Sequence, residues 1–220
     1  MQILGFLFLI TFSSYQINFD HKEASDSTSI HQLWLDCKLD SVISYNVFYT
    51  ACQGFNKMEN LKKKNLLTVI DYSLPSTEKR LFVIDLQNKN LLFECLVAHG
   101  KNSGENIASS FSNDPSSLKS SLGFFVTAET YNGKHGYSLK LDGLEKNIND
   151  NARSREIVIH GAAYVSEKVA AQAGRLGRSW GCLAVPVEIS KDLIDKISNG
   201  SCLFIYADDK FYRENSTFIK

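Results

Sequence analysis

Hydrophobic residues follow two different spacing patterns along this chain, and the pattern changes near residue 65. Residues 30–64 predict a helical segment, with Asp40 or Ser41 as its cap and Gly54 as its stop. From residue 66 the apolar residues gather in short runs of Leu, Ile, Val and Phe at 66–72, 81–86 and 91–98, with turn-forming residues between them. These runs predict a β-meander. The apolar positions at helical spacing are Val42, Tyr45, Phe48, Tyr49 and Cys52.

The second half of the chain continues the strand pattern. Residues 99–121 are rich in Gly, Ser and Asn and predict a long polar loop, which in a compact domain is functional or mobile. Strands are predicted at 123–128, 137–141, 156–160 and 202–206, with a hairpin turn at 132–136 and helices at 166–173 and 188–197. Continuous apolar strands indicate burial on both faces, so the fold class is mainly β, a sandwich or closed barrel with a few short helices.

The N-terminus carries an apolar run of ten residues from Ile3 to Phe12, followed by Ser13-Ser14. This run is shorter than the ~20 residues that span a bilayer, and it predicts a short signal peptide at 1–14 and export to the periplasm or cell envelope. Because the run has no preceding Lys or Arg, a strand or helix tucked into the core is the alternative. No later segment is apolar for long enough to be a transmembrane anchor.

Charge and cysteine content limit which classes of partner and which redox compartment the sequence suggests. The 24 basic and 24 acidic residues balance, so the chain has no electrostatic case for nucleic acid or an anionic membrane as its main partner. Five cysteines are too few for a disulfide scaffold and odd in number. Cys95 and Cys202 lie in apolar strands and are predicted core thiols. Cys37 and Cys52 could pair in an exported protein, but their spacing does not decide this.

The chemistry-bearing motifs reduce to one His–Cys arrangement. The sequence has no CxxC, HExxH, GxxxxGK[ST] or GxGxxG pattern. His160 closes an apolar strand, and Cys182 follows 22 residues later in a Gly-rich loop, where Arg178 could favour its thiolate. Gly181 would let backbone N–H groups converge on an oxyanion. The alternative is a structural role, with His160 at a strand end and Cys182 filling a loop.

Segment 160–186, HGAAYVSEKVAAQAGRLGRSWGCLAVP, resembles the catalytic motif of the YkuD-like L,D-transpeptidases, in the divergent branch of murein L,D-transpeptidase catalytic domain proteins. Segments 66–76, 79–85, 97–104, 120–127 and 131–144 look like the same branch, so the resemblance covers residues 66 to about 206. It implies a β-sandwich of mixed sheets. It also implies Cys182 as the nucleophile, His160 as its base, the Gly161 carbonyl as the group orienting the imidazole, and Ser179 and Gly181 in the nucleophile loop.

Two positions depart from the family pattern. Trp180 stands where the common motif has a second His, so His160 would act alone as acid and base. Leu183 stands where this branch is expected to have Pro. The resulting organisation is a signal peptide at 1–14, a linker and helical segment at 15–65, an L,D-transpeptidase-like catalytic domain at 66–210 and a tail at 211–220.

The resemblance implies a cell-envelope transpeptidase that acts on peptidoglycan stem peptides through a Cys182 thioester and forms 3–3 cross-links. Carbapenem-type β-lactams would then acylate the same thiol, and the chemistry needs no metal or organic cofactor. Alternatives are an L,D-carboxypeptidase on the same substrate and a non-catalytic peptidoglycan-binding module. The substrate-binding candidates, each with a structural alternative, are Arg178, Trp180, His99 and Tyr137.

Overall fold

The protein is described here by a computed structural model of residues 27–220. The predicted signal peptide at 1–14 and residues 15–26 of the predicted linker lie outside the described residues. Within residues 27–220, no helix is long and apolar enough to cross a membrane.

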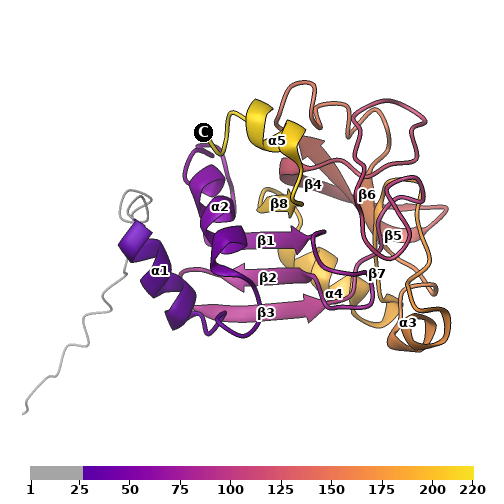
Figure 1. Ribbon diagram of the computed structural model, residues 1–220, viewed down its shortest axis with the longest axis horizontal. Coiled ribbons are helices and arrows are strands. Elements are labelled where there is room, and N and C mark those ends of the chain that lie inside the picture. The colour runs from indigo at the N-terminus through magenta and orange to yellow at the C-terminus, as the bar shows by residue number, and fades with distance from the viewer. Residues whose placement is uncertain (1–26) are drawn as a thin grey trace, which may run out of the picture.

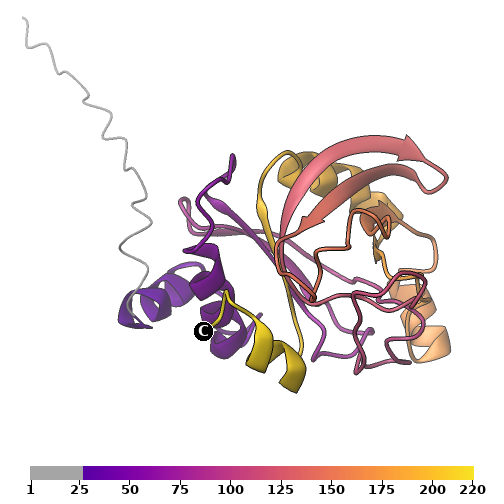
Figure 2. The same ribbon diagram turned by 90° about the horizontal axis from the view of Figure 1, so that it is seen from above.

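Eight strands form one mixed sheet in the order β3-β2-β1-β8-β4-β5-β6-β7, in which β1 with β8 and β6 with β7 are parallel neighbours. Figure 1 shows β1, β2 and β3 side by side, and Figure 2 shows the long β4–β5 hairpin curving away from them. The mainly β fold with mixed strand directions is therefore confirmed. The strands are β1 (Leu66–Asp71), β2 (Leu81–Asp85), β3 (Asn90–Cys95), β4 (Gly123–Gly133), β5 (Gly136–Gly143), β6 (Val158–Gly161), β7 (Leu183–Val185) and β8 (Cys202–Tyr206).

Helices cover parts of this sheet and explain why its central strands are apolar at every position. Every residue of β1 and β2 is buried. α2 (Tyr45–Phe55) packs against β1 and β8, and α4 (Val187–Ile197) packs against β5 and β6. Burial on both faces removes the polar alternation that a half-exposed strand would show.

The predicted helical segment at 30–64 is two helices, α1 (Ser27–Asp36) and α2, with irregular chain between them. Ser44, and neither Asp40 nor Ser41, caps α2, because its side chain accepts a hydrogen bond from the Val47 N–H. Gly54 is not a stop signal but lies inside α2. A Cβ there would lie 2.0 Å from the Phe124 ring, so the glycine permits close packing of the helix on the sheet.

The C-terminal residues, predicted as a tail, form α5 (Lys210–Asn215) and pack onto the domain. The buried carboxylate of Glu145 accepts hydrogen bonds from the Phe124 N–H at 2.8 Å, the Tyr212 hydroxyl at 3.1 Å and the Ser216 hydroxyl. Burial raises the pKa of Glu145. The carboxylate therefore depends on these three donors, two of which the C-terminal segment provides.

We expect Ser216→Ala to lower the free energy of unfolding by about 1–3 kcal/mol, because a buried acceptor loses a donor that water cannot replace. Urea unfolding followed by far-UV circular dichroism measures this change. Lys210→Ala, which removes an exposed ion pair with Glu214, is the matched control and should change little. Equal stabilities of the two variants would show that the Glu145 network does not hold the C-terminus.

Candidate active site

Strand pairing brings the predicted His–Cys pair to neighbouring segments of the chain. β6 and β7 run parallel, with His160 opposite Ala184. Cys182 lies two residues before Ala184, in the bend that leads into β7. Both His160 and Cys182 line one cleft of about 660 Å³. The two residues that the sequence singled out therefore share one cavity.

The hydrogen bond of His160 defines which ring nitrogen is available. The ring is buried, and its Nδ1 lies 3.0 Å from the Gly161 carbonyl oxygen. Because a carbonyl oxygen only accepts, Nδ1 carries the proton, and Nε2 of the neutral ring is left as the basic atom. Burial lowers the pKa of His160, and the nearby His135 lowers it further. The imidazole is therefore neutral near pH 7.

The Cys182 thiol is half-buried and uncharged at rest. Its Sγ lies 3.5 Å from the Glu156 carbonyl oxygen, to which the S–H donates. Burial raises the pKa of Cys182, and the Val158 N–H and the cations of Lys134 and Arg155 oppose that rise. Among the hydrogen bonds of residues 27–220, none joins this thiol to His160. The thiolate would therefore form by proton transfer during reaction rather than stand as a resting ion pair.

The loop before Cys182 is shaped by Ser179 and Gly181. The Ser179 hydroxyl donates to the Cys182 carbonyl at 2.7 Å and accepts from the Gly181 N–H at 3.0 Å. Gly181 has a φ of +126°, and a Cβ there would lie 2.8 Å from the Lys119 carbonyl oxygen. Only glycine fits this backbone. Its N–H, which the sequence analysis counted among the oxyanion donors, is bonded within the loop.

Arg155 is a cleft residue that sequence reasoning did not favour. Its guanidinium donates only to uncharged oxygens, on Ser112, Ser117, Lys119 and Ser121. No acidic side chain forms an ion pair with it among residues 27–220. The guanidinium thus ties the polar loop at 112–121 to the turn before β6, and its positive charge favours a Cys182 thiolate. The sequence carries no signal that distinguishes it from a surface arginine.

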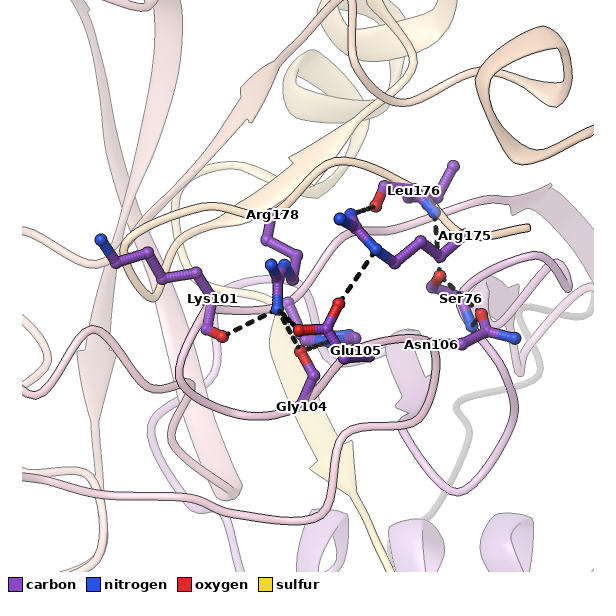
Figure 3. Close-up of polar contacts among 9 residues, drawn as sticks. Ser76, Lys101, Gly104, Glu105, Asn106, Arg175, Leu176 and Arg178 are labelled. Atoms are coloured by element: carbon purple, nitrogen blue, oxygen red, sulfur yellow. Dashed lines mark hydrogen bonds and ion pairs between the residues drawn. The ribbon is translucent and has the colours of Figure 1, made fainter. Parts of the chain in front are cut away.

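Two of the four substrate-binding candidates, Arg178 and Trp180, line the cleft. The Arg178 guanidinium forms an ion pair with Glu105 at 2.7 Å and also donates to the carbonyls of Lys101 and Gly104, as Figure 3 shows. It is therefore largely engaged within the protein. Trp180 is 67% exposed, so its ring is open to a ligand.

The other two candidates, His99 and Tyr137, are not among the residues that line the cleft. His99 is buried, accepts from Arg80 at 2.8 Å and lies 3.3 Å from the Gly104 carbonyl. Burial and the Arg80 charge lower the pKa of His99 to about 4. The Tyr137 hydroxyl donates to Asp195 at 2.5 Å. Their contacts give both residues structural roles.

The cleft is basic although the whole chain is neutral. Its lining has one acidic side chain, Glu156, and a larger set of cations. Lys140, Arg153 and Arg178 form ion pairs with carboxylates, so within residues 27–220 Lys134 and Arg155 are the cations of the lining without an ion pair. Among residues 27–220, no cluster of three His, Cys, Asp or Glu side chains is placed to hold a metal ion. The five basic residues of the lining are Lys134, Lys140, Arg153, Arg155 and Arg178.

Comparison with protein-family models matches residues 39–206 to the L,D-transpeptidase catalytic domain. This span is most of the chain, so the protein belongs to the L,D-transpeptidase catalytic domain family. The family predicted from the motif at 160–186 is confirmed. Comparison with curated protein sequences gave no match.

Solved structures with a similar fold include other L,D-transpeptidases. An L,D-transpeptidase from Mycobacterium smegmatis is 13% identical, with a TM-score of 0.41 over 65% of this chain and 59% of its own. One from Stackebrandtia nassauensis is 14% identical, with a TM-score of 0.39 over 84% and 79%. A third, the LD transpeptidase LdtMt1 in complex with imipenem, is 13% identical, with a TM-score of 0.40 over 64% and 59%. The chain thus spans about three-fifths of the first and third of these proteins.

We expect iodoacetamide to alkylate native Cys182 with a pH midpoint above the ~8.5 of a free cysteine, because burial raises the pKa of this thiol and the thiolate is the nucleophile. Mass spectrometry of the intact protein against pH gives the rate. Arg155→Gln should move the midpoint higher, since it removes a cation that favours the thiolate. Cys182→Ala is the control, because the other cysteines in residues 27–220 are buried. A midpoint below 8 would contradict the neutral resting thiol.

Proposed function

We propose that this protein is a peptidoglycan L,D-transpeptidase that works through a thioester on Cys182. The observation that carries the proposal is that Cys182 and His160 line the same cleft, within a chain of this family. The Nδ1–H···O=C bond to Gly161 supports it further, because it presents His160 Nε2 as a base.

In the first half of the reaction, Cys182 gives its proton to Nε2 of His160 and attacks the carbonyl of the third residue, a diamino acid, of a tetrapeptide stem. The tetrahedral intermediate collapses with cleavage of the bond to the terminal D-alanine. His160 returns the proton to the departing amine, and a thioester remains. Trp180 does not titrate, so one imidazole serves as both base and acid.

In the second half, the side-chain amine of another stem attacks the thioester carbonyl. The amine loses a proton to His160 and forms a 3–3 cross-link, and Cys182 leaves as the thiol. If water attacks instead, the product is a shortened stem and the enzyme is an L,D-carboxypeptidase. The two activities share the acylation step and differ in which acceptor reaches the thioester.

The charge and shape of the cleft suit a stem peptide. The positive charges of Lys134 and Arg155, which have no ion pair within residues 27–220, favour the carboxylates of the stem. The exposed Trp180 ring offers a surface for a sugar or an apolar side chain. Peptidoglycan lies outside the cytoplasmic membrane, so the proposal includes export to the cell envelope. The apolar run from Ile3 to Phe12 supports that part of the proposal.

We expect a carbapenem to add its mass to the wild-type protein and to leave Cys182→Ala unmodified, because the alanine variant has no thiol in the cleft. Both variants should unfold at similar temperatures, since the thiol is only half-buried. Mass spectrometry after carbapenem addition, followed by analysis of products from a purified tetrapeptide, gives the result. A cross-linked dimer indicates transfer and a tripeptide alone indicates hydrolysis. An unmodified wild-type protein would point to a non-catalytic module.

His160→Gln should slow acylation by on the order of 10²-fold, because the thiol loses its general base. In the wild type, the acylation rate should fall on acidification with a midpoint below about pH 6.5, since burial lowers the pKa of His160 and the neutral ring is the active form. Stopped-flow acylation between pH 4.5 and 8 measures both effects. Near-normal acylation by His160→Gln would show that another residue is the general base.

A further inference from the structure

One hairpin turn contacts both segments of the catalytic motif. The His135 ring stacks on the His160 ring, with centroids 4.4 Å apart and planes 20° from parallel. The neighbouring Lys134 holds its Nζ 5.3 Å from the centre of the Trp180 ring. All four residues line the cleft. The sequence pattern predicts this turn only as a connection between strands.

The register of β4 and β5 explains how the turn reaches the site. Ser138 of β5 lies opposite His160, and β5 begins two residues earlier at Gly136. Gly136 has a φ of +76° and pairs with Gly133, so the chain reverses over two residues, Lys134 and His135. The turn therefore rises from the strand beside His160. His135 stays exposed on one side while it covers the imidazole on the other.

The two contacts of His160 restrain different motions of its ring. The hydrogen bond from Nδ1 to Gly161 holds one edge of the ring. A hydrogen bond at one atom leaves the ring able to tilt about that atom. A second ring stacked on its face opposes this tilt and also shields the imidazole from water. His160 forms no hydrogen bond to the Cys182 thiol at rest. Both restraints therefore help to hold the imidazole in the orientation in which it can accept the thiol proton.

We propose that His135 is a positioning residue for His160, and that its stacked ring keeps Nε2 directed into the cleft. The contact between Lys134 and Trp180 holds the turn in the position in which His135 stacks on His160. The inference rests on the proposed role of His160 as the base. Trp180 stands where the family motif has a second His. In this proposal its role is to contact Lys134 on the hairpin.

Two variants separate stacking from titration. His135→Phe keeps an aromatic ring over His160 but has no ionisable nitrogen, and His135→Ala removes the ring. We expect His135→Ala to reduce the acylation rate by about tenfold with little change in KM. We expect His135→Phe to restore most of that rate. His31→Ala, on α1 and outside the cleft, is the matched control and should behave as wild type.

The pH profile gives a readout that a merely structural role would not move. Loss of the covering ring exposes His160 to water. Because burial is the main cause that lowers the pKa of His160, the pKa should then rise. The acid limb of His135→Ala should therefore move to higher pH, while that of His135→Phe stays closer to wild type. The other titratable and charged groups that line the cleft, unchanged in these variants, are Tyr131, Lys134, Lys140, Arg153, Arg155, Glu156, Tyr164, Arg178 and Cys182.

Wild-type rates and an unchanged acid limb in His135→Ala would overturn the proposal. So would a His135→Phe variant as slow as His135→Ala, because stacking would then not be the cause. An NMR titration of the His160 ring in the three proteins tests the same contact without any turnover. A third outcome is that the wild type shows no acylation while the His160 titration still differs between the wild type and the His135 variants. That result would contradict the proposed function but support the stacking of His135 on His160.

Discussion

The parallel pairing of β6 with β7 is the constraint on which the site depends. Parallel neighbours need a crossover connection, and here the chain between Gly161 and Leu183 supplies it through α3 (Glu167–Ala173). Ser166 caps this helix, and Gly174 ends it in a left-handed conformation. The return path delivers Cys182 to the start of β7, beside the strand that carries His160. Loss of this pairing would separate Cys182 from His160 without changing either residue.

Buried positive charge organises the loops around that pair. Arg80 is fully buried and donates to the carbonyls of Leu74 and Val97 and to His99, and Arg155 donates to four oxygens of segment 112–121. Such arginines satisfy backbone acceptors that would otherwise be buried without donors. The polar loop at 99–121 is thus held by its hydrogen bonds, and its serines and carbonyls replace the carboxylates that usually accompany a buried guanidinium.

The same burial defines the electrostatic state of the reacting groups. It raises the pKa of Cys182 and lowers the pKa of His160, so both groups are neutral before substrate binds. Three of the five cations of the cleft, Lys140, Arg153 and Arg178, form ion pairs with carboxylates. The positive charge left to the site is therefore that of Lys134 and Arg155.

The sequence by itself determined the β-rich class, every strand except β7, and the His–Cys pair, because these depend on local apolar runs and on one motif within residues 160–186. β7 falls in a segment that the sequence predicted as a Gly-rich loop. Tertiary structure decided the rest. It set the break between α1 and α2, the docking of α5 on Glu145, the burial of His99 and the engagement of Arg178 by Glu105. It also placed Arg155 behind Cys182 and His135 on His160. Those contacts join residues that are distant along the chain, and no local pattern records which strand edge or loop a side chain will meet.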